Sequence, residues 1–271
     1  MAHARTLMFV PGDRPDRFAK AVASGADGIV LDLEDAVAPS NKDSARSMVA
    51  DWLAGGGSAA VRVNAVDTPW FADDLAAIGD FGCTIMLPKA SVDDVAAVAR
   101  LADDPRLLVL IETAAGIIGA PSICACPNVI RAAFGSIDLS TEIGVNPDDR
   151  EALGCARSTV VLASAAAGIA PPLDGVTTDL TSGEPAGADA EYVARLGFTG
   201  KLCIHPVQIG PVNAAFEPSA AQLAWARKVL DAVGAGAIKV DGHMIDAPVL
   251  ERARRLIARH ELLSAPGVPT R

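Results

Sequence analysis

The sequence predicts an α/β fold, specifically a TIM barrel of eight parallel strands, on three observations. Eight apolar runs alternate with amphipathic segments along the chain. The length of 271 residues suits a single domain of this type, which typically has about 250 residues. Hydrophobic residues make up 51% of the chain and aromatic residues only 4%, as expected for parallel strands of Ala, Val, Ile and Leu covered by helices. We therefore expect one domain, residues 1–271, with the barrel at about 5–206.

The first four expected strands each give way to a turn or to polar residues. A helix is expected after each of them, and Ser91 with Asp94 forms a predicted capping box for the fourth. The other three helices are expected to begin after Asp13, at about Lys42 and near Thr68. The strands are expected at Thr6–Val10, Gly28–Leu33, Ala59–Val63 and Thr84–Leu87.

The second half of the barrel is expected to follow the same alternation. An Ala-rich helix is predicted between Asp148 and Gly168, and a further helix ends at Gly197. The strands are expected at Leu107–Ile111, Arg131–Leu139, Leu173–Val176 and Leu202–Ile204.

The segment at about 207–271 is not needed to close a barrel. Two helices are predicted there, Val207–Phe216 and Ala220–Val233. A β-hairpin follows, with strands Ala237–Val240 and His243–Ile245 around the turn Asp241-Gly242. A last helix, Ala247–Leu263, completes what we expect to be additional C-terminal helices and a hairpin-helix arm.

Composition and charge exclude several classes of protein. The formal net charge of −10 argues against nonspecific binding to nucleic acid or to an anionic membrane surface. The chain has no apolar run of the roughly 20 residues that a membrane span needs, and its N-terminus lacks a signal-peptide cleavage pattern, so we expect a cytoplasmic protein. The five cysteines are an odd number in apolar contexts, and we expect reduced thiols.

Two acids that follow neighbouring strands predict a metal site. Glu112 comes directly after the fifth expected strand, and Asp138 is delivered by the sixth. Two carboxylates, with the remaining positions filled by water and substrate oxygens, are typical ligands of Mg²⁺. The alternative for Glu112 is a cap on the next helix, and for Asp138 a turn residue.

Other polar residues are expected at the same mouth, because the loops that follow barrel strands gather at one face. Arg62 could bind a substrate carboxylate bidentately, or it could pair with Glu34 or Asp35 for structure only. Gly135 permits close approach, so the backbone amides of Ser136 and Ile137 could bind a carboxylate oxygen.

Further polar side chains carry weaker hypotheses. His205 is a possible general base, although a His before Pro is often only hydrogen bonded in place. Lys89 as a Schiff-base lysine competes with the metal as a way to stabilise an enolate. Arg14, Arg17 and Lys20 could meet phosphates or simply belong to a solvated helix face.

The order of eight motifs resembles that of the citrate lyase beta-subunit-like family, relatives of malyl-CoA and citramalyl-CoA lyases. The motifs are LMFVPGDRPDRFAKA, DGIVLDLEDAV, VRVN, MLPKA, LIETAAG, FGSIDL, CIHPVQI and GHMIDAPV. The resemblance implies a TIM barrel, usually trimeric or a multiple of it, and Mg²⁺-dependent cleavage or formation of a carbon-carbon bond in a β-hydroxyacyl thioester. It also implies that Arg62 binds substrate and that Glu112 and Asp138 hold the metal.

The resemblance further points to Asp246, in the motif GHMIDAPV, as the group that moves the proton. In that interpretation the hairpin-helix arm carries Asp246 to the barrel mouth of a neighbouring subunit. The alternatives within one subunit are Glu34, Asp35 and His205. Asp246 could instead, or in addition, be the N-cap of the helix that begins at Ala247.

The expected function is therefore a Mg²⁺-dependent lyase acting on a CoA or acyl-carrier thioester and a 2-oxo acid. A metal-dependent 2-oxo-acid aldolase that uses no CoA is the first alternative, and a non-catalytic binding subunit is the second. The apolar wall Val160–Gly168 and the surplus helices predict a homo-oligomer, a trimer or a multiple of it.

Overall fold

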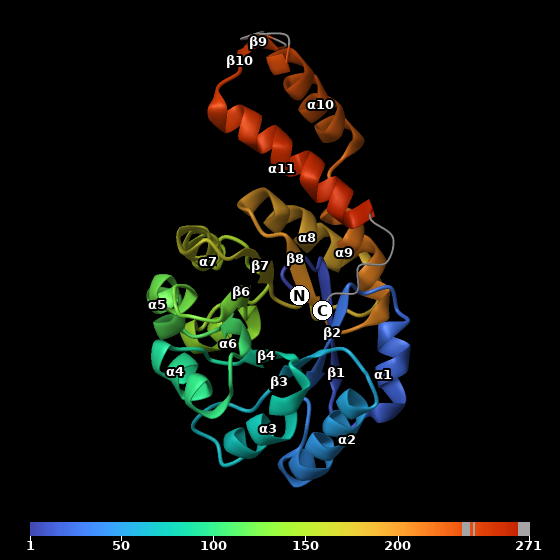
Figure 1. Cartoon of the computed structure of the whole chain (residues 1–271), viewed down its shortest axis with the longest axis vertical. Helices are drawn as coiled ribbons and strands as arrows, with labels where there is room; N and C mark the ends of the chain where they lie inside the picture. The colour runs from blue at the N-terminus through green and yellow to red at the C-terminus, as the bar shows by residue number, and fades with distance from the viewer. Residues whose placement is uncertain (235–238, 241, 265–271) are drawn as a thin grey trace. The chain divides into compact units, whose positions relative to one another are not determined.

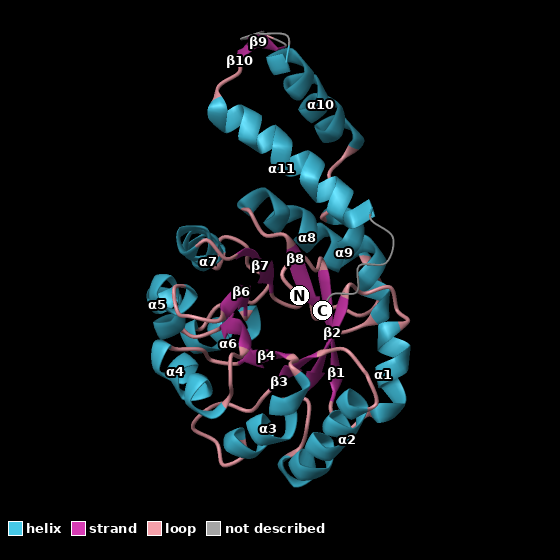
Figure 2. Cartoon of the chain, in the orientation of Figure 1, coloured by secondary structure: helices cyan, strands magenta, loops and turns pink. Residues whose placement is uncertain are grey.

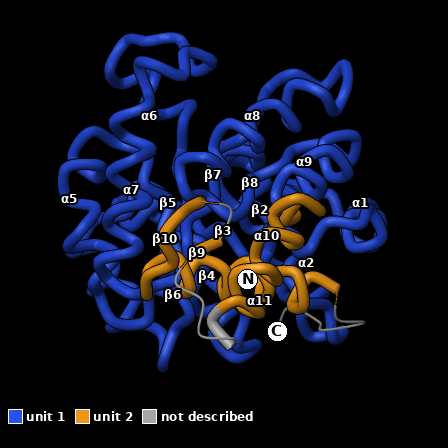
Figure 3. The backbone as a smooth tube through the Cα atoms, turned by 90° about the horizontal axis from the view of Figure 1, so that it is seen from above, with its two compact units in different colours: residues 1–216, 270–271 blue, residues 217–269 orange. Residues whose placement is uncertain are grey.

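The computed structural model describes residues 1–234, 239–240 and 242–264. The chain forms two compact units, Met1–Phe216 and residues 217–269, which are coloured separately in Figure 3. The first unit holds all of the expected barrel together with the first of the two surplus helices. That the whole chain behaves as one domain stays a prediction.

Within the described part of the first unit, eight parallel strands close into a barrel in sequence order, with the first strand paired to the eighth (Figure 1). This confirms the predicted TIM barrel. The strands are β1 (Thr6–Pro11), β2 (Gly28–Asp32), β3 (Ala60–Arg62), β4 (Thr84–Leu87), β5 (Arg106–Ile111), β6 (Val129–Phe134), β7 (Ala170–Asp174) and β8 (Gly200–Cys203).

Helices surround the barrel on its outer side (Figure 2). The predicted capping box is confirmed, since the Asp94 amide donates to Ser91 Oγ and the Ser91 amide donates to Asp94 Oδ2. The α-helices are α1 (Pro15–Val22), α2 (Lys42–Ala54), α3 (Phe71–Ile78), α4 (Val92–Leu101), α5 (Ala114–Cys124), α6 (Ser136–Ile143), α7 (Gly154–Ala167), α8 (Glu184–Leu196) and α9 (Ile209–Ala215). Short 3-10 helices lie at η1 (Pro39–Asn41), η2 (Gly79–Phe81) and η3 (Pro206–Gln208).

The unbroken apolar run of β5 is explained by burial on both faces of the sheet. Leu108 and Leu110 belong to a cluster inside the barrel, which also contains residues of several other strands. Leu107, Val109 and Ile111 belong to the second cluster, where strands meet the surrounding helices. Because neighbouring side chains point to opposite faces of a strand, both sets must be apolar.

Three predicted elements differ most from the structure in their bounds. β6 ends at Phe134 rather than at Leu139, and residues 136–143 form α6, so Asp138 lies in the first turn of a helix and not at a strand end. β7 begins at Ala170, and its next two residues are prolines. The register between β6 and β7 shifts in this stretch. Proline is unfavourable inside a strand, which is why the sequence placed this strand too late. The helix expected from Asp148 begins only at Gly154.

The second unit contains α10 (Ala220–Gly234), β9 (Lys239–Val240), β10 (His243–Met244) and α11 (Ala247–Ser264). β9 and β10 pair antiparallel, which confirms the predicted hairpin. Its first residues, Ala237 and Ile238, and its turn residue Asp241 lie outside the described residues. A small core of Ala226, Val229 and Ala253 joins α10 to α11.

All five cysteines are free thiols, and none of the described helices has the length and apolar character to cross a membrane.

Candidate functional site

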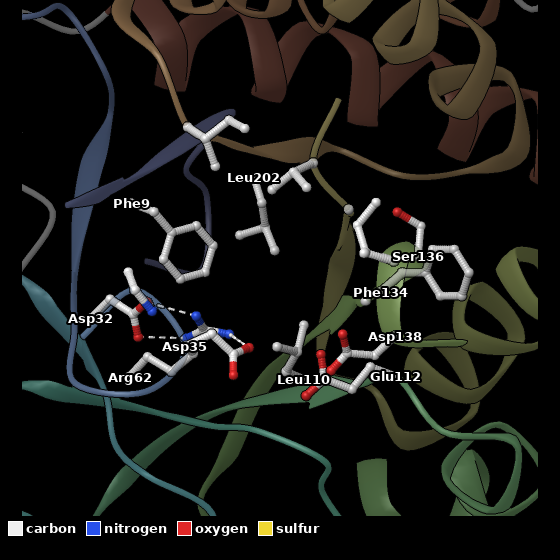
Figure 4. A pocket seen from close by; sticks show the side chains of 16 residues that line it. Phe9, Asp32, Asp35, Arg62, Leu110, Glu112, Phe134, Ser136, Asp138 and Leu202 are labelled. Atoms are coloured by element: carbon white, nitrogen blue, oxygen red, sulfur yellow. Dashed lines mark hydrogen bonds and ion pairs between the residues drawn. The ribbon is translucent and has the colours of Figure 1, made fainter. Parts of the chain in front are cut away.

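A cavity of about 350 Å³ opens at the carboxyl ends of the strands in the first unit. Its polar wall is formed mainly by the residues that the sequence singled out, and its apolar wall comes from several strands (Figure 4). The predicted lining residues are Asp35, Arg62, Glu112, Gly135, Ser136, Ile137 and Asp138. The apolar lining includes Phe9, Leu110, Phe134, Val176 and Leu202.

Arg62 is a buried guanidinium fixed by three acids. Its Nε and Nη2 donate to the two carboxylate oxygens of Asp32 at 2.7 and 2.6 Å. Its Nη1 lies 2.8 Å from Glu34 Oε2 and 3.5 Å from Asp35 Oδ2. Burial by itself would lower the pKa of Arg62, but the charges of Asp32 and Glu34 outweigh burial and raise it. Arg62 therefore stays charged, and its contacts with these acids fix the orientation of its guanidinium group.

Asp32 is the partner of Arg62 that sequence reasoning did not single out. The two residues are neighbours in the register of β2 and β3, so the strand pairing brings them together. The alternative that Arg62 pairs with Glu34 or Asp35 is also realised, and it does not remove Arg62 from the cavity wall. The ring of Phe9 lies 4.9 Å from the guanidinium carbon and covers it from the apolar side.

Glu112 and Asp138 lie together on the other side of the cavity from Arg62 (Figure 4). Glu112 is buried, and its Oε1 accepts a hydrogen bond of 2.9 Å from the backbone amide of Lys89. Burial and then the neighbouring charge of Asp138 raise the pKa of Glu112 from 4.5 to about 8. Thr113, not Glu112, caps α5 by accepting from the Gly116 amide, so the alternative that Glu112 is a helix cap is wrong.

Gly135 is required where β6 meets α6, because its Cα packs against the Glu112 side chain. A Cβ at this position would overlap Glu112 Cβ and lie 2.6 Å from its Oε2. The same residue precedes the first turn of α6, whose backbone amides have no partners inside the helix. The absence of a side chain at Gly135 thus leaves room for Glu112 in its observed position.

We expect Gly135→Ala to lower kcat/KM by roughly 100-fold, since a misplacement of about 1 Å in an active site has effects of that size. The new methyl group must displace the Glu112 side chain. The matched control is Gly119→Ala in α5, where a Cβ would meet only Ile123 Cδ1, at 3.7 Å. Steady-state kinetics and Mg²⁺ titration calorimetry of both variants check this prediction. Equal kinetics for the two variants would contradict it.

Lys89 connects the two halves of the site. Its Nζ donates to Glu34 Oε1 at 2.8 Å and lies 3.9 Å from Asp138 Oδ2. Burial lowers the pKa of Lys89, but the hydrogen bond to Glu34 more than offsets this and the pKa is raised. The pKa of Glu34 is also raised, because burial outweighs the charges of Arg62 and Lys89. Lys89 is therefore a charged partner of acids rather than a neutral amine ready to form a Schiff base.

Comparison with known proteins places this arrangement in a family. The model of the HpcH/HpaI aldolase/citrate lyase family matches residues 5–206. The chain belongs to this family. The family predicted from the eight motifs is confirmed, and with it the assignment to a family of lyases and aldolases.

Several family members resemble the chain over nearly its whole length. A citrate lyase subunit beta-like protein of Deinococcus radiodurans is 38% identical over 95% of this chain and 97% of its own. A (3S)-malyl-CoA thioesterase of Cereibacter sphaeroides is 34% identical over 98% of this chain and 99% of its own. The crystal structure of CitE from Mycobacterium tuberculosis, in complex with magnesium, acetoacetate and coenzyme A, matches with a TM-score of 0.84 and 36% identity, and covers 96% of this chain and 99% of its own.

The carboxylates of this family member fit a hard cation. Glu112 and Asp138 supply oxygen donors. Burial, and then the charge of Asp138, disfavour the charged form of Glu112, and a bound cation would offset this. No group of three or more His, Cys, Asp or Glu side chains in the described part of the chain is arranged to hold a metal. A cation at this pair would therefore complete its shell with water or substrate oxygens, as Mg²⁺ does.

Two other candidates, His205 and Asp246, cap helices in the structure. His205 is exposed and its Nδ1 accepts a hydrogen bond of 3.2 Å from the Val207 amide, so it caps η3. Asp246 belongs to the second unit, where its Oδ1 accepts from the Val249 amide at 3.1 Å. The N-cap role of Asp246 is thus confirmed. Its proposed role in catalysis is a separate matter, because one carboxylate can cap a helix and still exchange a proton.

Proposed function

We propose that the chain is a Mg²⁺-dependent carbon-carbon lyase that cleaves or forms a β-hydroxyacyl thioester of CoA or an acyl carrier. The products of cleavage are an acetyl thioester and a 2-oxo acid. The observation that carries the proposal is the placement of Glu112 with Asp138 across one cavity from a fixed Arg62. The magnesium, acetoacetate and coenzyme A in the related CitE structure support it.

The arrangement assigns separate tasks to the two sides of the cavity. Bound at Glu112 and Asp138, Mg²⁺ would act as a Lewis acid on the carbonyl of the 2-oxo acid. Arg62, held by Asp32, would bind the carboxylate of the acid or stabilise the alkoxide oxygen that forms on carbonyl addition. The Ser136 and Ile137 amides would bind a second carboxylate oxygen. The apolar wall of Phe9, Leu110 and Leu202 excludes water from the reacting carbon atoms.

We further propose that Asp246 of a neighbouring subunit moves the proton in a homo-oligomer, a trimer or a multiple of it. A carboxylate that enters with a closing arm could take or return the proton as a general base or acid. Asp246→Asn and Arg62→Ala proteins should each be inactive alone and regain partial activity when they assemble together. Near-normal turnover of Asp246→Asn alone, with only a lower Tm, would leave the capping role as its only one.

A substrate screen tests the proposed reaction. Malyl-CoA, citramalyl-CoA, hydroxymethylglutaryl-CoA and citryl-CoA are incubated with the protein and Mg²⁺, and the acyl products are separated. We expect at least one of them to give an acetyl thioester and a 2-oxo acid. The matched control is the same protein with the chelator EDTA in place of Mg²⁺.

The screen also separates the alternatives. Cleavage of free hydroxy-oxo acids, with every thioester untouched, would favour a 2-oxo-acid aldolase without CoA, and the family includes aldolases. Release of free CoA together with an intact hydroxy acid would favour a thioesterase, the activity named for the Cereibacter sphaeroides relative. No turnover of any compound would favour a non-catalytic subunit.

A further inference from the structure

We propose that Lys89 weakens Mg²⁺ binding in the substrate-free protein, because its ammonium group lies beside Asp138, one of the two carboxylates that would hold the cation. This inference rests on the proposed function, since it takes Glu112 and Asp138 as the metal site. Its consequence is that the metal and an anionic 2-oxo acid bind cooperatively: the charge of the acid offsets the repulsion between Lys89 and the cation.

The backbone of Lys89 is held in an unusual conformation beside the metal site. Lys89 follows β4 after Pro88 and has a φ of +48°, in the left-handed region that residues with a Cβ seldom adopt. In this conformation its amide donates to Glu112 Oε1 at 2.9 Å. The strained turn thus fixes the base of the Lys89 side chain next to one proposed ligand.

The side chain of Lys89 then reaches the second proposed ligand. Its Nζ lies 3.9 Å from Asp138 Oδ2 while it donates to Glu34 Oε1 at 2.8 Å. The other oxygen of Glu34 is in contact with Arg62 Nη1 at 2.8 Å. Glu34 therefore has two cationic partners, and it keeps one of them if Lys89 moves.

The Lys89 side chain also has room to move. It is 43% exposed, whereas the side chains of Arg62 and Glu34 are 11% and 7% exposed. A divalent cation bound to Asp138 Oδ2 would repel an ammonium group that lies 3.9 Å from the same oxygen. Metal binding must then either displace Lys89 toward solvent or occur against this repulsion. Both outcomes lower the affinity of the site for Mg²⁺.

Removal of the Lys89 charge should therefore tighten metal binding. We expect Lys89→Met to bind Mg²⁺ roughly tenfold more tightly than the wild type in the absence of substrate, a modest Coulomb effect for a partly solvated pair. Lys89→Arg, which keeps the charge, should bind Mg²⁺ like the wild type. Lys20→Met is the matched control, because it removes the same charge from an exposed position on α1. Titration calorimetry with MgCl₂ alone measures all four proteins.

The direction of the change distinguishes this role from a merely structural one. Loss of a structural contact would weaken Mg²⁺ binding and lower the Tm, so equal or weaker binding by Lys89→Met would overturn the proposal. A second measurement repeats the titration with oxalate, a stable dianion that resembles a 2-oxo acid. Oxalate should increase Mg²⁺ affinity less in Lys89→Met than in the wild type. If Glu112→Gln binds Mg²⁺ as the wild type does, the proposed metal site itself is wrong, which is a different result.

Discussion

Glu112→Gln should abolish Mg²⁺-dependent turnover and weaken Mg²⁺ binding by roughly 100-fold or more, because it removes one of the two proposed charged ligands while keeping the shape of the side chain. The metal-free variant should be at least as stable as the wild type. Its buried amide replaces a carboxyl whose charged form is disfavoured by burial and by Asp138. Calorimetric titration with MgCl₂ and thermal unfolding with and without the metal measure the two effects.

The control for Glu112→Gln is Glu151→Gln, which makes the same change at an exposed position. Unchanged Mg²⁺ affinity in Glu112→Gln, or full activity after chelation of the metal, would be incompatible with the two-carboxylate site.

The Mg²⁺ affinity of the wild type should rise as the pH is raised and level off above about 8, the pKa of Glu112, because a proton on Glu112 competes with the metal.

Arg62→Lys should lower kcat/KM by roughly 100-fold or more, the size of effect seen when one preorganised donor to a developing charge is lost. Lysine keeps the charge that Asp32 and Glu34 need, but it has no planar fork to bind Asp32 and, as proposed, a substrate oxygen at the same time. Arg62→Ala would also leave buried acids unpaired and destabilise the fold by about 3–5 kcal/mol. The lysine variant therefore separates the catalytic effect from the stability effect.

The matched control for Arg62→Lys is Arg5→Lys. Arg5 also binds an aspartate with two nitrogen atoms, since its Nε and Nη2 donate to Asp27 at 2.9 Å each, and its side chain is 14% exposed. Arg5 does not line the cavity, so its variant should lose some stability and keep its kcat/KM. Steady-state kinetics and thermal unfolding of both variants are compared. Equal kcat/KM losses would mean that Arg62 acts through stability alone.

The barrel could be predicted because its strands carry a pattern that only a doubly covered parallel sheet requires. The apolar runs at β4 and β5 fall where the structure has these strands. Glu112 and Arg62 could be placed at the mouth because each follows or ends such a run, and the order of strands then brings them together. The capping box at Ser91 could also be predicted, because it depends only on residues that are close together in the sequence.

The contacts that refine the site depend on side-chain geometry that no local pattern records. Asp32 was passed over as the main partner of Arg62, because its role depends on the register between β2 and β3. The left-handed backbone conformation at Lys89 could not be predicted, because this position holds neither glycine nor asparagine. Asp138 was expected at a strand end, and its place in the first turn of α6 follows from the early end of β6 at Phe134.

The proposed function is tested most directly by running the reaction toward synthesis. Acetyl-CoA is incubated with glyoxylate, pyruvate or oxaloacetate, with Mg²⁺ or with EDTA, and the thioesters are identified by mass spectrometry. The proposal predicts a new β-hydroxyacyl-CoA whose mass is the sum of acetyl-CoA and one 2-oxo acid, formed only with Mg²⁺ and not by Glu112→Gln. Consumption of acetyl-CoA to free CoA alone, or formation of the adduct in EDTA, would contradict a metal-dependent carbon-carbon lyase.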